Sequence, residues 1–180
     1  YGRKGDYFHF YEINPDVITL AKSPFTFLKD SPAEIGITLA DARVALERQE
    51  PQNYDLLVLD AFSGDAIPAH LLTMEAFDVY KKHLRKDGVI AIHISNRYLN
   101  LYPVVSGLAA GNGYGLICID TEHDDDAGQD EAGSSWCLLS TNADLLKRPE
   151  MQVLKADEYY NDRPAIQWTD QYSNLLHVLD

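Results

Sequence analysis

The chain has 180 residues, a length that suits one domain with a sizeable hydrophobic core. Its hydrophobic fraction of 46% and its charged fraction of 24% are those of ordinary soluble globular proteins. The formal net charge is −13 and the 15 lysines and arginines are scattered, which argues against a nucleic-acid-binding protein. An acidic surface fits a cationic substrate, although many soluble proteins are equally acidic.

Predicted strands and helices alternate in the first quarter of the chain. Residues 6–13 are rich in aromatic side chains and predict a strand. Asn14 and Pro15 follow as the N-cap and the first residue of a short helix. A second, short strand is expected over residues 36–39, and Asp41 then opens another helix.

The middle of the chain holds the clearest strand and the clearest helix. Residues 54–61 contain four consecutive aliphatic side chains, and a continuous apolar strand is typical of a parallel sheet covered on both faces. Residues 71–86 predict a helix because apolar side chains recur at helical spacing and basic residues fill the last turn. Gly88 is expected to end this helix, and residues 88–95 form the next strand.

The last part of the chain has a different pattern. A helix is expected near residues 102–110, followed by strands at 116–120 and 134–140 and a mixed tail, 150–180, that wraps over the sheet. The acidic segment 123–133 reads as a solvated loop, because it lacks the glycine and glutamate spacing of a calcium loop. No helix separates the last two strands, which predicts an antiparallel hairpin.

Alternation of strands and helices at this length is typical of βαβ units. We therefore predict an α/β fold with a doubly wound, mostly parallel, Rossmann-like sheet and an antiparallel hairpin at one edge. No domain boundary is evident, so residues 1–180 are expected to form a single domain. The chain starts at Tyr1 and not at methionine, which indicates a fragment or a processed piece.

The two cysteines, Cys118 and Cys137, each lie inside an apolar run. They are expected to be buried small hydrophobic residues and not a disulfide. No apolar run reaches the ~18 residues of a membrane span, and no signal peptide is present. We therefore expect a cytoplasmic protein that makes no membrane contact through this chain.

The six histidines show no metal-ligand spacing with cysteines or carboxylates, so no metal is expected. His93 alternates within a predicted strand and is expected to be a satisfied core histidine. His70 lies in the loop after Asp60 and could face a cleft.

Three carboxylates follow predicted strands, where ligands bind in open α/β sheets: Glu12, Asp41 and Asp60. Each has a structural alternative, because Glu12 could pair with the helix N-terminus at Asn14 and Asp41 could cap its own helix. Asp60 could likewise cap the loop that follows it. In a functional reading, Glu12 accepts hydrogen bonds from ribose hydroxyls, Asp41 and the Ala42 backbone read a purine, and Asp60 faces the reacting centre.

The segments FYEINPDV, LADAR, YDLLVLDAFSGDAIPAHLLTMEAF, GVIAIHISN and WTDQYSNLL follow one another in order along nearly the whole chain. In this order and spacing they resemble the spermidine synthase (polyamine aminopropyltransferase) family, and most of all its bacterial spermidine-synthase-like branch. The resemblance implies the class I S-adenosylmethionine-dependent methyltransferase fold. It also implies an enzyme that transfers an aminopropyl group from decarboxylated S-adenosylmethionine to a polyamine.

Residue by residue, the resemblance places the cofactor nucleoside at two of the strand ends. Glu12, with its neighbour Ile13, matches the acidic position that holds the ribose of decarboxylated S-adenosylmethionine. Asp41 and Ala42 match the acidic-small pair that reads adenine. The same likeness makes decarboxylated S-adenosylmethionine, or S-adenosylmethionine itself, the expected co-substrate.

The resemblance also assigns the acceptor side of the reaction. Asp60 matches the aspartate that takes a proton from the attacking amine. Asp65 and Ser63 are the expected amine-binding residues in the following loop. Typical synthases carry two aspartates three residues apart here, whereas Asp60 and Asp65 are five apart, which puts polyamine specificity in question.

A second departure concerns the cofactor. The family's glycine-rich loop, which cradles the methionine-derived part, and its amino-terminal β-domain have no counterpart, because the sequence begins beyond them. Two alternatives therefore stay open: a methyltransferase that uses S-adenosylmethionine on a small acceptor, and a catalytically inactive binding or oligomerisation module. The expected partners are a polyamine and, from the resemblance alone, a second copy of the chain in a homodimer.

Overall fold

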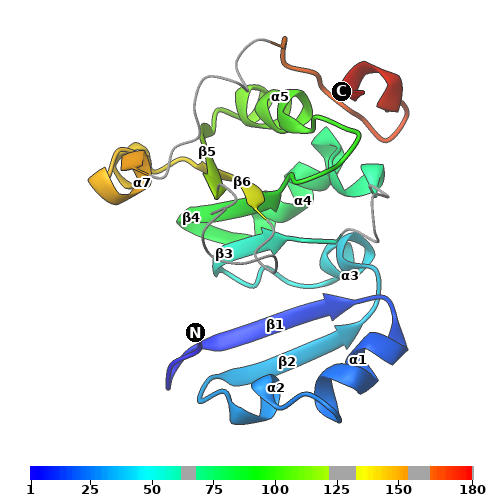
Figure 1. Cartoon of the computed structure of the whole chain (residues 1–180), viewed down its shortest axis with the longest axis vertical. Helices are drawn as coiled ribbons and strands as arrows, with labels where there is room; N and C mark the ends of the chain where they lie inside the picture. Colours follow the sequence, from blue (N-terminus) through cyan, green and yellow to red (C-terminus); the bar gives the residue numbers. More distant parts are fainter. Residues whose placement is uncertain (62–67, 122–132, 154–162, 180) are drawn as a thin grey trace. The chain divides into compact units, whose positions relative to one another are not determined.

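The computed structural model describes most of the chain (Figure 1). The described residues are 1–61, 68–121, 133–153 and 163–179. They form two compact units, Tyr1–Glu50 and Pro51–Asp180, and each unit is described by itself. The expectation of a single domain therefore stays a prediction.

The first unit is a parallel pair of strands with three helices. Its elements in chain order are β1 (Tyr7–Glu12), α1 (Pro15–Lys22), α2 (Phe27–Asp30), β2 (Glu34–Leu39) and α3 (Ala42–Arg48). The two predicted strands and the helices that follow them are confirmed, whereas the short α2 was not expected from the sequence.

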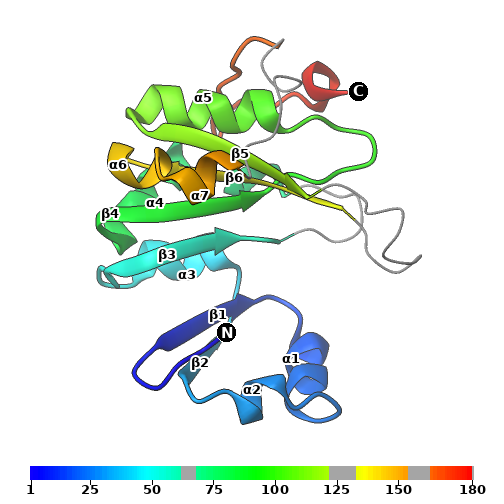
Figure 2. The same cartoon turned by 60° about the vertical axis from the view of Figure 1, so that its left-hand side comes forward.

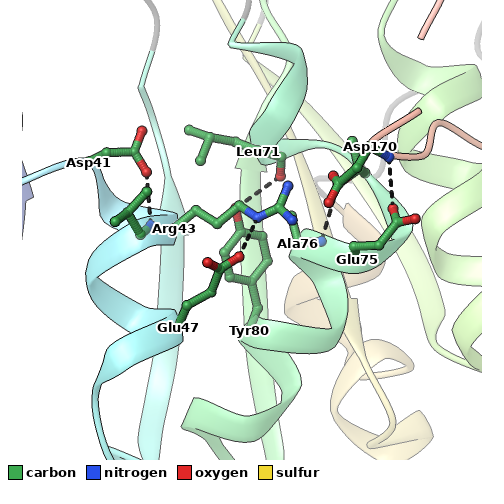
Figure 3. Close-up of polar contacts among 10 residues, drawn as sticks. Asp41, Arg43, Glu47, Leu71, Glu75, Ala76, Tyr80 and Asp170 are labelled. Carbon is green, nitrogen blue, oxygen red and sulfur yellow. Dashed lines mark hydrogen bonds and ion pairs between the residues drawn. The ribbon is translucent and has the colours of Figure 1, made fainter. Parts of the chain in front are cut away.

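Side-chain caps start both longer helices of this unit directly after a strand. The Asn14 side chain accepts a hydrogen bond from the Asp16 backbone N–H at 2.9 Å, and Pro15 takes the first helical position of α1. Asp41 Oδ1 accepts from the Val44 N–H at 2.9 Å and begins α3 (Figure 3). Because the caps follow the strands so closely, each chain turn carries polar groups at the carboxyl end of its strand.

The second unit contains a four-stranded sheet and the remaining helices. Its strands are β3 (Tyr54–Leu59), β4 (Leu84–His93), β5 (Gly115–Thr121) and β6 (Ser134–Ser140). Its helices are α4 (Met74–His83), α5 (Tyr102–Asn112), α6 (Ala143–Leu146) and α7 (Pro149–Val153), with 3-10 turns at Ala69–Leu71 and Leu175–Val178.

The strand order of this sheet is β3-β4-β6-β5. β3 and β4 are parallel, whereas β6 pairs antiparallel with both β4 and β5. The expected antiparallel hairpin is therefore confirmed. Among the described residues β1 pairs only with β2, so the strands form two sheets where the sequence led us to expect one.

The core of the second unit lies between its sheet and its helices. α5 packs beside β5 and β6, as Figure 2 shows for β5. Side chains with almost no exposed surface come from helices and strands alike: Ala76, Phe77 and Tyr80 of α4, Val104 and Val105 of α5, Ile90 of β4 and Leu139 of β6. The Tyr80 hydroxyl is satisfied by donating to the Leu71 carbonyl oxygen at 3.0 Å (Figure 3).

The tail after residue 163 packs on helices α4 and α5. The Ile166 N–H donates to the Pro103 carbonyl oxygen at 2.8 Å, and the Met74 N–H donates to the Trp168 carbonyl oxygen at 2.9 Å. Asp170 accepts from the Thr73 hydroxyl at 2.8 Å and its N–H donates to Glu75 at 3.0 Å (Figure 3). The sequence predicted that the tail covers the sheet. The described part of the tail instead contacts helices.

Close approach of the tail explains one glycine of α5. A Cβ atom at Gly107 would collide with the backbone carbonyl of Ile166. Only glycine therefore lets the tail lie directly on this face of α5.

The predicted helix 71–86 is too long. Thr73 caps α4 by accepting from the Ala76 N–H at 3.2 Å, and the helix ends at His83. Leu84 already pairs with Tyr54 of β3, and the register shifts between Tyr54 and Leu56. Pairing with β3 therefore draws the basic residues before Gly88 into β4 and outweighs their helical spacing.

One face of β3 lies open, contrary to the expectation for its continuous apolar sequence. Leu57 and Leu59 are 7% and 8% exposed, whereas Leu56 and Val58 are 53% and 51% exposed. Alternate residues of a strand point to opposite faces, so the described residues of the second unit cover only one face of β3.

The two cysteines form a disulfide, which corrects the expectation of two free buried thiols. Cys118 of β5 and Cys137 of β6 are directly opposite each other in the antiparallel register, with Cα atoms 4.2 Å apart. Both residues are buried as expected. The pairing depends on a strand register that apolar runs alone do not reveal.

Candidate functional site

The carboxyl end of the β1–β2 pair gathers four of the predicted cofactor residues. Glu12 ends β1 and pairs in register with Leu39, the last residue of β2. The Ala40 N–H donates to the Glu12 carbonyl oxygen at 3.0 Å, and Asp41 and Ala42 follow at once. Sequence positions about 30 apart are thus brought to one edge of the first unit.

Glu12 is anchored by the turn that follows it. Its Oε1 accepts a hydrogen bond from the Asn14 backbone N–H at 2.7 Å. This is the helix N-terminus contact that was the structural alternative for Glu12. It fixes one carboxylate oxygen and leaves Oε2 pointing to no partner among the described residues. Ile13, beside it, is 69% exposed.

Asp41 has the capping role that was its structural alternative, through the bond to Val44 described above. Ala42 is the first residue of α3, where backbone N–H groups lack intrahelical acceptors. On the next turn, Arg43 and Glu47 form an ion pair at 2.9 Å (Figure 3). The cap holds Asp41 Oδ1 at the start of α3, and the binding roles of Glu12, Ile13, Asp41 and Ala42 stay predictions.

The second unit places Asp60 directly after β3, beside the end of β4. Asp60 Oδ1 lies 2.8 Å from His93 Nδ1, and the two side chains are 55% and 22% exposed. β3 and β4 are parallel neighbours, so their carboxyl ends meet at one edge. Asp60 is therefore an accessible carboxylate with one oxygen held by a neighbouring strand.

His93 is the residue whose importance the sequence analysis missed. Its two ring nitrogens are satisfied, as expected, because Nε2 lies 2.8 Å from Ser95 Oγ. However, it lies at the edge beside Asp60 and not in the interior. The sequence contained the information needed to find it. If residues 54–61 and 88–95 form neighbouring parallel strands, Asp60 and His93 lie side by side at the carboxyl ends of these strands.

Two predicted amine-binding residues, Ser63 and Asp65, lie outside the described residues. His70 lies in the 3-10 turn before α4 and is exposed. Within the described ranges, no group of three or more histidines, cysteines and carboxylates could hold a metal ion. No helix in the same ranges is long and apolar enough to cross a membrane.

Comparison with known proteins tests the resemblance. A polyamine aminopropyltransferase of Vibrio vulnificus (strain CMCP6) is 29% identical over 92% of this chain. The structure of a probable spermidine synthase from Corynebacterium glutamicum covers 93% of this chain with a TM-score of 0.64 at 17% identity. The chain is similar in sequence to a polyamine aminopropyltransferase and in fold to a probable spermidine synthase.

This likeness confirms the fold as α/β and methyltransferase-like, of the Rossmann-like class. The chain spans 60% of the length of the Vibrio protein and 64% of the Corynebacterium chain. An N-terminal histidine N-methyltransferase of Emericella nidulans is also similar, at 36% identity over 46% of this chain and 15% of its own. No protein-family model matches the chain.

Proposed function

We propose that this spermidine-synthase-like chain is an aminopropyltransferase domain that acts on decarboxylated S-adenosylmethionine and a polyamine. The observation that carries the proposal is Asp60, an exposed carboxylate after β3 with one oxygen bonded to His93. This residue matches the family's proton-accepting aspartate. The likeness to a polyamine aminopropyltransferase over 92% of the chain supports the same reaction.

The chemistry asks for a base at this position. A polyamine ammonium has no free electron pair, so it first gives a proton to the Asp60 carboxylate. The amine nitrogen then attacks the aminopropyl carbon bonded to the sulfonium. A carbon–nitrogen bond forms, the carbon–sulfur bond breaks, and its electron pair stays on sulfur as a neutral thioether. Because this leaving group is already activated, positioning of the two reactants supplies most of the rate enhancement.

The first unit would hold the nucleoside. The Oε2 atom of Glu12 would accept from ribose hydroxyls while Oε1 stays on the Asn14 N–H. Asp41 would accept from the adenine amino group and the Ala42 N–H would donate to a ring nitrogen, with Ile13 as apolar cover. Support comes from their common place at the carboxyl end of the β1–β2 pair.

The acceptor would be a cation attracted by the acidic chain. The net charge of −13 favours a polycation over an anionic or neutral substrate. Ser63 and Asp65 would bind the distal amines. We further propose that residues 1–180 act as one domain in the cytoplasm. The proposal that this domain forms a homodimer rests on the resemblance alone.

A methyltransferase is the second candidate. The similarity to an N-terminal histidine N-methyltransferase over 46% of the chain favours it. The nucleoside contacts would be the same, and the transferred group would be a methyl in place of an aminopropyl.

The test is a transfer assay with decarboxylated S-adenosylmethionine and a diamine, run in parallel with S-adenosylmethionine. Asp60→Asn should lower kcat by about 100-fold or more, because a general base contributes about 10²- to 10⁴-fold. Asp55→Asn is the matched control, since Asp55 lies on β3, the strand that Asp60 follows, in an exposed ion pair with Arg85. Equal activity of both variants would contradict the role of Asp60, and methyl transfer alone would favour the second candidate.

A further inference from the structure

A continuous chain of hydrogen bonds leads from Asp60 across the carboxyl edge of the four-stranded sheet. Asp60 Oδ1 bonds to His93 Nδ1 at 2.8 Å, and His93 Nε2 bonds to Ser95 Oγ at 2.8 Å. Ser95 Oγ in turn accepts from the Ser135 backbone N–H at 2.7 Å. The Ser135 hydroxyl donates to Asp120 at 2.6 Å. This series of hydrogen bonds therefore connects residues in or directly after β3, β4, β6 and β5, in that order.

The chemistry of the partners assigns the protons for an ionised Asp60 and a neutral His93 ring. The carboxylate can only accept, so the ring proton then lies on Nδ1. Nε2 is then an acceptor and takes the Ser95 hydroxyl proton. The oxygen of Ser95 keeps a lone pair for the Ser135 N–H, so every donor faces an acceptor along the chain.

Packing against a neighbouring side chain holds the His93 ring in the orientation in which both ring nitrogens make these hydrogen bonds. Trp136 is its partner in the β4–β6 register, and the two rings are stacked with centroids 4.8 Å apart and planes 23° apart. The ring is only 22% exposed, whereas Asp60 is 55% exposed. A rigid, mostly covered donor thus contacts an exposed carboxylate.

We propose that His93 is a positioning residue for Asp60, and that Ser95 positions His93. The inference rests on the proposed role of Asp60 as the base. The Nδ1–H of His93 holds Oδ1 in place, which leaves Oδ2 to take the proton of the acceptor ammonium. The proton moves from the amine nitrogen to Oδ2, and no proton moves onto or off the imidazole.

Three variants separate this role from a purely structural one. His93→Phe keeps a ring that can stack on Trp136 but removes the donor. His93→Asn keeps an amide N–H near the place of Nδ1, so it should retain much of the transfer activity that His93→Phe loses. Ser95→Ala removes the hydroxyl that holds the His93 ring in one tautomer and leaves the ring itself unchanged. His177→Phe, at an exposed histidine of the tail, is the control.

Two readouts are measured on the folded 180-residue chain, with a melting curve for each variant. The first is the tautomer of the His93 ring, from the ¹⁵N chemical shifts of its two ring nitrogens at constant pH. We expect the proton on Nδ1 in the wild type, and we expect Ser95→Ala and Asp60→Asn each to shift the signals toward a mixture of the two tautomers, because each removes a partner of the ring. The His177→Phe control should leave the signals of the His93 ring unchanged.

The second readout is the split between kcat and KM in the aminopropyl transfer assay. We expect His93→Phe to lower kcat by about 10- to 100-fold with little change in KM for the nucleoside substrate. Ser95→Ala should lower kcat less, and His93→Asn should recover most of it.

The failures of the two proposals are distinguishable. Ring ¹⁵N signals that are unchanged in both Asp60→Asn and Ser95→Ala, or a kcat of His93→Phe equal to that of the wild type, overturn the positioning role. A wild-type chain that transfers no aminopropyl group overturns the proposed function, even if the His93 tautomer responds to Ser95→Ala.

Discussion

At the scale of single residues, hydrogen bonds determine how firmly the side chain of each predicted site residue is held in place. Glu12, Asp41 and Asp60 each have a carboxylate oxygen in a structural contact, with Asn14, Val44 and His93 respectively. The structural alternatives raised by the sequence for Glu12 and Asp41 are therefore present in the fold, and the functional roles of the two residues stay predictions. A fixed carboxylate loses less conformational freedom on binding than a mobile one.

A pH-dependent prediction arises from His9 in β1. Burial lowers the pKa of His9 from its ordinary value of 6.5, while its ring stacks on Tyr11 and bonds to Thr38. Above pH 6.5 the ring is neutral in both states. As the pH falls below 6.5 the unfolded chain binds the proton first, so the free energy of unfolding decreases until the lowered pKa is passed.

Urea denaturation at about pH 7.5 and about pH 5.5 measures this effect. The wild type should lose more stability between the two pH values than His9→Gln, which cannot titrate. His177→Gln, at an exposed site, is the control. Identical losses in the wild type and in His9→Gln would contradict the assignment.

At the scale of elements, β3 offers a matched pair of leucines. Leu57 is buried and Leu56 is half exposed, although they are neighbours in one strand. Leu57→Ala should lower the free energy of unfolding by about 2–4 kcal/mol, because it removes buried methyl groups and leaves a cavity. Leu56→Ala should cost less than about 1 kcal/mol. Equal losses in chemical denaturation would mean that both faces of β3 are covered.

Helices and strands were predicted best where a local sequence pattern determines where they begin. The caps at Asn14 and Asp41 and the run of aliphatic residues in β3 were sufficient to predict the starts of two helices and one strand. The end of α4 was not predicted, because pairing of Leu84 with Tyr54 overrides the helical spacing of its sequence. Register is a property of two strands, so the Cys118–Cys137 disulfide and the Asp60–His93 contact were also missed.

At the scale of the whole molecule, ordered motifs predicted more than composition did. The segments around Glu12, Asp41 and Asp60 predicted a fold that the structure of the probable spermidine synthase from Corynebacterium confirms at only 17% identity. The acidic composition is compatible with a cationic substrate but does not identify one. The division of the described strands into two sheets was not predicted, because strand patterns do not specify which edges pair.

The central claim is that the chain binds a decarboxylated S-adenosylmethionine-like nucleoside through the carboxyl end of the β1–β2 pair. Calorimetric titration with S-methyl-5′-thioadenosine, S-adenosylmethionine and its decarboxylated form tests it most directly. Asp41→Ser is the informative variant, because serine keeps the helix cap of α3 while removing the carboxylate; Asp16→Ser, in α1, is the control. We predict micromolar binding of the decarboxylated form and of the thioadenosine, weakened at least about tenfold by Asp41→Ser only. Failure of all three nucleosides to bind the folded chain would contradict the account and favour an inactive binding or oligomerisation module.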